Sequence, residues 1–235
     1  KKPQANINIQ NDDDDVVVND NISSKKKRHC VPLTASEYKM RKRFCAAFML
    51  SAVGDTLGFK NGFWEFDTCH SDVSQKTDPL KIVKEFLSLG GYSEINLKNW
   101  YVSDDTILTH AVAQGILKED PIDGVMDKMI KALNKYHYDE RIDRFFGNTT
   151  ILFLNKLKKD RDWSRFVTNT RGGGSGAAMR SMPIGLLYNR KHQLEELTHL
   201  SLVTSLMTHS HPLGYMGGFI SALFTSYAVN NIPIE

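Results

Sequence analysis

Helical periodicity constrains the fold of this chain more than any other feature of its sequence. From about residue 37 onward, apolar residues recur three and four positions apart, which places them on one face of a helix. Two such faces are Ile107, Leu108, Ala111, Val112, Gly115, Ile116 and Val125, Met129, Ile130, Leu133. The alternation of apolar and polar residues that marks strands is not sustained anywhere. The sequence therefore predicts an all-α fold, a helical bundle with functional loops at helix ends.

Three further segments extend this pattern. Residues 40–53 combine large apolar residues with several small ones, which predicts a helix packed closely on its neighbours. A charged helix with one apolar face is expected near residues 194–201. Residues 214–229 are apolar nearly all round, so we expect a fully buried helix there.

Composition is that of a globular protein with an added tail. The 235 residues are 41% hydrophobic and 24% charged, which excludes wholesale disorder, collagen and coiled coil. The apolar runs fall short of a membrane span, so no membrane partner is expected. Residues 1–36 are polar, with an acidic run at 12–15 and a basic run at 25–28. They predict a disordered low-complexity tail before a single domain at 37–235.

The charge of the chain argues against nucleic-acid binding. Its net charge of +3 comes from the N-terminus, because residues 44–235 hold 20 basic and 21 acidic residues. Binding of nucleic acid needs a basic face. The basic run Lys25, Lys26, Lys27, Arg28 is either a solvated charge run or a nuclear-import signal. Three cysteines without paired or metal-like spacing indicate a reducing compartment, so a cytoplasmic protein is expected.

A pair of carboxylates precedes the first of these helical faces, in Ser103-Asp104-Asp105-Thr106. Serine is a favoured N-cap, and acids in a first turn complement the helix dipole. The same oxygen cluster would suit a hard cation such as Mg²⁺ or Mn²⁺. Both interpretations stay open at this point.

A glycine-rich segment occupies residues 171–180, with the sequence RGGGSGAAMR. It predicts a flexible loop that leads into a helix N-terminus, where backbone N–H groups could hold a phosphate or pyrophosphate. The alternative is a plain linker. We place Arg180 one turn into that helix, as a phosphate ligand or as an ordinary salt-bridge partner.

Two further segments carry candidate functional side chains. His209 and His211 lie in a predicted turn between two helices, where they would either cap helices or bind zinc. Glu65 lies between Trp64 and Phe66, shortly after the glycine-punctuated residues 54–58. It is either a surface glutamate or a partly desolvated general acid or base.

The order of these motifs is distinctive. SAVGDTLGF, NGFWEF, WYVSDDTILTHA, GGGSGAAMRSMPIGL and MTHSHPLGYMGGFISALFTSYAV follow one another between residues 40 and 229. Together they resemble the ADP-ribosylglycohydrolase family, and most of all its ADP-ribosylarginine hydrolases. The resemblance implies a compact orthogonal bundle of helices that hydrolyses ADP-ribose from protein side chains. It also implies two Mg²⁺ or Mn²⁺ ions.

The resemblance assigns roles to residues of this chain. It implies metal ligation by Ser103, Asp104 and Asp105, and catalytic roles for Glu65, Asp104 and Asp105. It implies substrate binding by the glycine loop and the histidine turn, namely Gly172, Gly173, Gly174, Ser175, Gly176, Ala177, Met179, Arg180, His209 and His211.

One motif of the family is not found. A second metal motif, Gly-Asp-x-Asp-Ser/Thr, does not follow residue 105, so we expect the domain to be C-terminally incomplete. The function expected is that of a monomeric, metal-dependent hydrolase acting on arginine-ADP-ribosylated proteins. The first alternative is a non-catalytic module that binds ADP-ribose or another partner. The second is a mononuclear pyrophosphohydrolase acting on free ADP-ribose.

Overall fold

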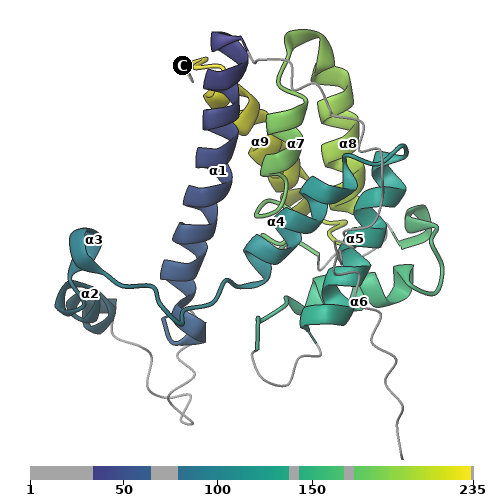
Figure 1. Cartoon of the computed structure of the whole chain (residues 1–235). Coiled ribbons are helices and arrows are strands. Elements are labelled where there is room, and N and C mark those ends of the chain that lie inside the picture. Colours follow the sequence, from purple (N-terminus) through teal and green to yellow (C-terminus); the bar gives the residue numbers. More distant parts are fainter. Residues whose placement is uncertain (1–33, 65–78, 138–142, 167–171, 234–235) are drawn as a thin grey trace, which may run out of the picture. The chain divides into compact units, whose positions relative to one another are not determined.

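The computed structural model of the chain describes residues 34–64, 79–137, 143–166 and 172–233. These residues form helices and loops without any strand, which confirms the all-α prediction (Figure 1). The helices are α1 (Ala35–Phe59), η1 (Lys60–Gly62), α2 (Pro79–Ser88), α3 (Gly91–Glu94), α4 (Asp104–Gly115), α5 (Pro121–Tyr136), α6 (Asn148–Leu157), η2 (Trp163–Phe166), α7 (Met182–Leu187), η3 (Lys191–Gln193), α8 (Leu194–Leu206) and α9 (Pro212–Val229).

The core joins two groups of helices. In the first, α4 packs on α5 and α5 on α6; in the second, α7, α8 and α9 pack on one another (Figure 1). The two groups share one buried apolar cluster that includes Leu108 of α4, Met129 of α5, Ile184 of α7 and Leu197 of α8. The apolar faces predicted for α4 and α5 point into this cluster, so their periodicity identified the core correctly.

The contact between α4 and α5 depends on two glycines. A Cβ atom on Gly115 would lie 2.4 Å from the Cα of Val125, and one on Gly124 would lie 2.4 Å from the carbonyl oxygen of Gly115. The two backbones therefore touch at this point. The sequence also starts α5 sharply, because the Asp120 carboxylate caps the helix and Pro121 follows it.

Two predictions about burial are wrong. α9 is not fully buried: its covered side carries mostly small residues at four-residue spacing, while its other sides expose Leu213, Met216, Ile220 and Phe224. α1 is not closely packed along its length, since Met49 and Leu50 are 66% and 70% exposed. In both helices the apolar content indicated a helix but did not tell which sides its neighbours cover.

The predicted tail lies outside the described residues up to residue 33. α1 begins at Ala35, so the last two residues assigned to the tail belong to a helix. Among the residues that the structure describes, no helix is both long and apolar enough to cross a membrane.

We expect Gly115→Ala to lower the free energy of unfolding by about 1–3 kcal/mol, because the added methyl group forces the backbones of α4 and α5 apart. Gly54→Ala is the matched control, since a Cβ atom there meets no other atom within 4 Å. Urea denaturation followed by circular dichroism measures both. Equal stability of the two variants would contradict the close contact.

Candidate active site

The segment with the paired carboxylates, residues 103–106, forms the N-terminus of α4 and caps it. The hydroxyl of Ser103 accepts a hydrogen bond from the backbone N–H of Asp105 at 3.1 Å, which confirms the capping interpretation. Asp104 is buried, and its backbone N–H donates to the carbonyl of Arg144 at 3.0 Å. The backbone N–H of Gly147 donates to the Asp104 carboxylate at 3.4 Å. Metal ligation by this motif stays a prediction.

Asp55 of α1 is a site residue to which the sequence analysis assigned no role. Its carboxylate accepts hydrogen bonds from the backbone N–H of Ser103 at 3.0 Å and from the Ser103 hydroxyl at 2.6 Å. It also accepts from the backbone N–H of Thr106 at 3.2 Å and from the Thr106 hydroxyl. The sequence signal available for Asp55 was a carboxylate that lies between two glycines near the end of a helix. Its partners lie 48 and 51 positions away, so no local pattern could identify them.

The segment that follows α1, η1, is hydrogen-bonded to the residues that precede α4 at a second place. Asn61 accepts a hydrogen bond from the backbone N–H of Tyr101 at 2.7 Å and donates to the carbonyl of Asn99 at 3.2 Å. The predicted motifs at residues 54–58 and 103–106, and the start of NGFWEF at Asn61, therefore form one unit in the fold.

The electrostatics of this unit favour a cation. Asp105 as a residue is exposed, but its carboxyl group is partly desolvated by its surroundings. This desolvation and the negative charge of Asp55 raise the pKa of the Asp105 carboxyl group to about 6. The Asp105 carboxylate accepts no hydrogen bond from the described residues. A positive ion beside Asp105 would offset both unfavourable contributions.

The described part of the chain offers only part of a metal site. It contains no cluster of three or more His, Cys, Asp or Glu side chains arranged to hold a metal ion. Asp104 and Asp105 could supply two ligands of a hard divalent cation, with the remaining ligands to come from water, substrate or other residues, and this stays a prediction.

The glycine-rich loop lies against α4, because the Thr109 hydroxyl donates to the carbonyl of Met179 at 3.1 Å. One expectation about this loop is wrong. Residues 175–180 form turns and α7 begins only at Met182, so Arg180 precedes the helix instead of lying one turn into it. Gly172 is buried, whereas Gly173, Gly174 and Ser175 are exposed. Binding of a diphosphate by this loop stays a prediction.

Arg180 is fully buried beneath the loop. Its guanidinium donates to the carbonyl of Gly176 at 2.6 Å, to the carbonyl of Thr204 at 2.9 Å and to the hydroxyl of Thr208 at 2.8 Å. Burial lowers the pKa of the guanidinium to about 10, against the opposing attraction of Asp104. These contacts favour a role in shaping the loop over direct contact with a ligand.

The two histidines lie under the glycine loop. A Cβ atom on Gly176 would lie 2.7 Å from Cε1 of His209, and one on Gly173 would lie 3.1 Å from Nδ1 of His211. His211 caps α9 by accepting from the backbone N–H of Leu213 at 3.2 Å. Only glycine lets the loop approach the buried His209 ring so closely.

Burial and the charge of Arg180 lower the pKa of His209 to about 3, so its imidazole is neutral at neutral pH. Nδ1 of this ring lies 2.8 Å from the hydroxyl of Thr208, which Arg180 also contacts. His209 therefore belongs to the same buried polar network as Arg180.

Glu65 lies outside the described residues, so its assigned role is untested. Its neighbour Trp64 donates through Nε1 to Glu85 of α2 at 2.9 Å and packs edge-on against Trp100. All other predicted site residues are described, and the fold brings the carboxylate pair, the glycine loop and the histidine turn together.

The described residues thus define an all-helical protein in which paired carboxylates at a helix N-terminus adjoin a glycine-rich loop. The chain belongs to the ADP-ribosylglycohydrolase family, which it matches over residues 36–235.

Curated relatives agree with this assignment. The chain is 36% identical over 198 residues to the ADP-ribosylhydrolase ARH1 of Dictyostelium discoideum, a match that covers 80% of this chain and 48% of that protein. A protein of Acanthamoeba polyphaga mimivirus is 32% identical over 192 residues, covering 77% and 36%. The mouse ADP-ribosylhydrolase ARH3 is 32% identical over 138 residues, covering 56% and 36%. The chain spans about half the length, or less, of these relatives.

Asp55→Asn should lower the pKa of Asp105 from about 6 toward its ordinary value, because the neighbouring negative charge is lost. It should also lower the free energy of unfolding by about 2 kcal/mol, because the hydrogen bonds to Ser103 and Thr106 lose a charged acceptor. NMR titration of the Asp105 carboxyl carbon and urea denaturation measure the two effects. Asp127→Asn, on the exposed side of α5, is the control and should leave the pKa of Asp105 unchanged.

His209 should make the protein less stable in acid. Its pKa is about 3 in the folded state and ordinarily 6.5, so its contribution to stability is complete above pH 6.5 and declines as the pH falls toward 3. Asp105 acts in the opposite direction, since its raised pKa favours the folded state at low pH. Thermal unfolding between pH 7 and pH 4 should show a smaller loss for His209→Gln than for the exposed-site control His192→Gln. Identical slopes would contradict a buried neutral His209.

Proposed function

We propose that the protein to which this chain belongs hydrolyses the N-glycosidic bond between ADP-ribose and arginine side chains of modified proteins. The observation that carries this proposal is the contact between α4 and the glycine-rich loop. There the carboxylates of Asp104 and Asp105 lie on the helix that Thr109 joins to Met179. Family membership and the similarity to ADP-ribosylhydrolases support the same reaction class.

Each part of the site suits one part of the substrate. Exposed backbone at Gly173, Gly174 and Ser175 can donate hydrogen bonds to a diphosphate, which would position the substrate with binding energy remote from the bond that breaks. The reacting ribose carbon becomes oxocarbenium-like as its bond to arginine breaks, so nearby carboxylates would stabilise its developing positive charge.

Asp104 and Asp105 are the residues that would hold Mg²⁺ or Mn²⁺, with Ser103 beside them. A bound divalent ion would supply a Lewis acid and lower the pKa of a water molecule. Asp55 would keep the Ser103 hydroxyl and the first turn of α4 in one orientation while ligands exchange. Glu65 is proposed as a further carboxylate for orienting water or the departing group.

Removal of one ligand carboxylate tests the proposal. Asp105→Asn should lower Mg²⁺-dependent release of ADP-ribose from an arginine-modified peptide by about 100-fold, because charge stabilisation at the reacting centre is lost. It should also weaken Mn²⁺ binding measured by electron paramagnetic resonance. Asp120→Asn is the matched control, because Asp120 is likewise an acid at a helix N-terminus, and it should retain both properties.

The alternatives predict different results in the same assays. A non-catalytic module would bind ADP-ribose in calorimetry but release none from peptides, with or without metal. Release from a serine-modified peptide and not from an arginine-modified one would reject the arginine linkage. Conversion of free ADP-ribose to AMP and ribose phosphate would instead indicate the pyrophosphohydrolase.

A further inference from the structure

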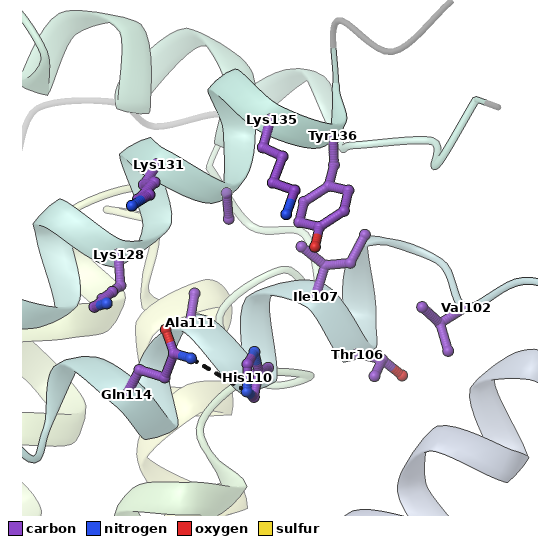
Figure 2. A pocket seen from close by; sticks show the side chains of 11 residues that line it. Val102, Thr106, Ile107, His110, Ala111, Gln114, Lys128, Lys131, Lys135 and Tyr136 are labelled. Carbon is purple, nitrogen blue, oxygen red and sulfur yellow. Dashed lines mark hydrogen bonds between the residues drawn. The ribbon is translucent and has the colours of Figure 1, made fainter. Parts of the chain in front are cut away.

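A basic pocket lies between α4 and α5 (Figure 2). Thr109, through which α4 contacts the glycine loop, is not among the residues that line it. Its volume is about 470 Å³. Lys128, Lys131 and Lys135 of α5 form one wall, and His110 and Gln114 of α4 form the other. No acidic side chain is among the described residues that line it.

The three lysines of this pocket have no ionic partner among the described residues. Their spacing of three and four positions places them on one face of α5, where their like charges repel one another. The carboxylates on the neighbouring face are already paired, since Asp127 and Asp123 both contact Arg161, at 2.7 Å and 3.4 Å. The positive charge of the pocket is therefore not neutralised by α5 itself.

The rest of the pocket is suited to a flexible polar chain. The ring of His110 and the amide of Gln114 lie 3.4 Å apart on successive turns of α4 and offer further polar atoms (Figure 2). Ile107, Ala111 and Ala132 add an apolar floor between the two walls. Such a floor can pack against the aliphatic part of a ligand while the lysines meet its charges.

We propose that this pocket binds an acidic segment of a protein chain, through two or three aspartate or glutamate side chains. From Lys128 to Lys135 the helix rises about 10 Å, at 1.5 Å per residue. An extended peptide covers that distance in about three residues. Nucleic acid would need a longer basic track, and the chain beyond residue 43 is nearly neutral.

The pocket lies next to the carboxylate pair of the candidate active site. One end of it is formed by Thr106, the residue after Asp105 and a hydrogen-bond partner of Asp55. An acidic segment bound along α5 would therefore place its neighbouring residues beside the carboxylate pair. If the proposed function is correct, the pocket would favour target proteins that carry acidic residues near the modified side chain. The binding of an acidic peptide does not depend on the proposed function.

Fluorescence anisotropy of a labelled hexaglutamate peptide with the full chain tests the proposal. Lys131→Gln and Lys135→Gln should each weaken binding about three-fold, and the double variant about ten-fold, as expected for exposed ion pairs. The control double variant, Lys84→Gln with Lys159→Gln, removes the same charge from surfaces outside the pocket and should bind like the parent. Thermal unfolding should be unchanged in all four variants.

Equal weakening in the control, or none in the pocket variants, would overturn the proposal. So would tighter binding of tripolyphosphate, or of a six-nucleotide single strand, than of hexaglutamate, because either would identify a phosphate site. The two proposals can fail separately. Asp105→Asn should lower hydrolysis about 100-fold under the proposed function but leaves the pocket lysines in place, so it should bind hexaglutamate as the parent does.

Discussion

The buried guanidinium of Arg180 is the group on which the arrangement of the site depends. A cation without solvent is stable only if its donors are satisfied, and here two carbonyl groups and one hydroxyl group accept from it. Because those acceptors belong to the glycine loop, to α8 and to the turn that follows α8, the buried charge ties the loop to the bundle. With a pKa of about 10, the guanidinium stays protonated at neutral pH.

Asp55 plays the complementary part at the N-terminus of α4. Its carboxylate binds the N-cap residue and the first turn, so α4 is held from α1 while Thr109 holds it to the loop. Asp105 is left between these anchors with a raised pKa and no hydrogen-bond donor among the described residues. These contacts keep the energetically unfavourable Asp105 carboxylate in place, as the proposed cation site would require.

Much of the fold followed from local patterns. The spacing of Leu108 and Val112 marked the buried face of α4, and the serine before two acids marked its start. The patterns failed where burial depends on neighbours: α9 looked apolar all round, yet Met216 and Phe224 are exposed. They failed again at Arg180, because the glycine-rich segment closes into turns before α7 begins.

The amino-acid order was sufficient to establish helices, caps and the motifs that mark the family, because each of these depends on residues a few positions apart. It was not sufficient to show that Asp55 meets Ser103, that Arg180 is buried under Gly176, or that three lysines of α5 face α4. Those contacts join segments distant in the chain, and their geometry exists only once the helices have packed. Packing therefore turned separate motifs into one site and left beside it a basic pocket whose lysines have no ionic partner in the part of the chain that the structure describes.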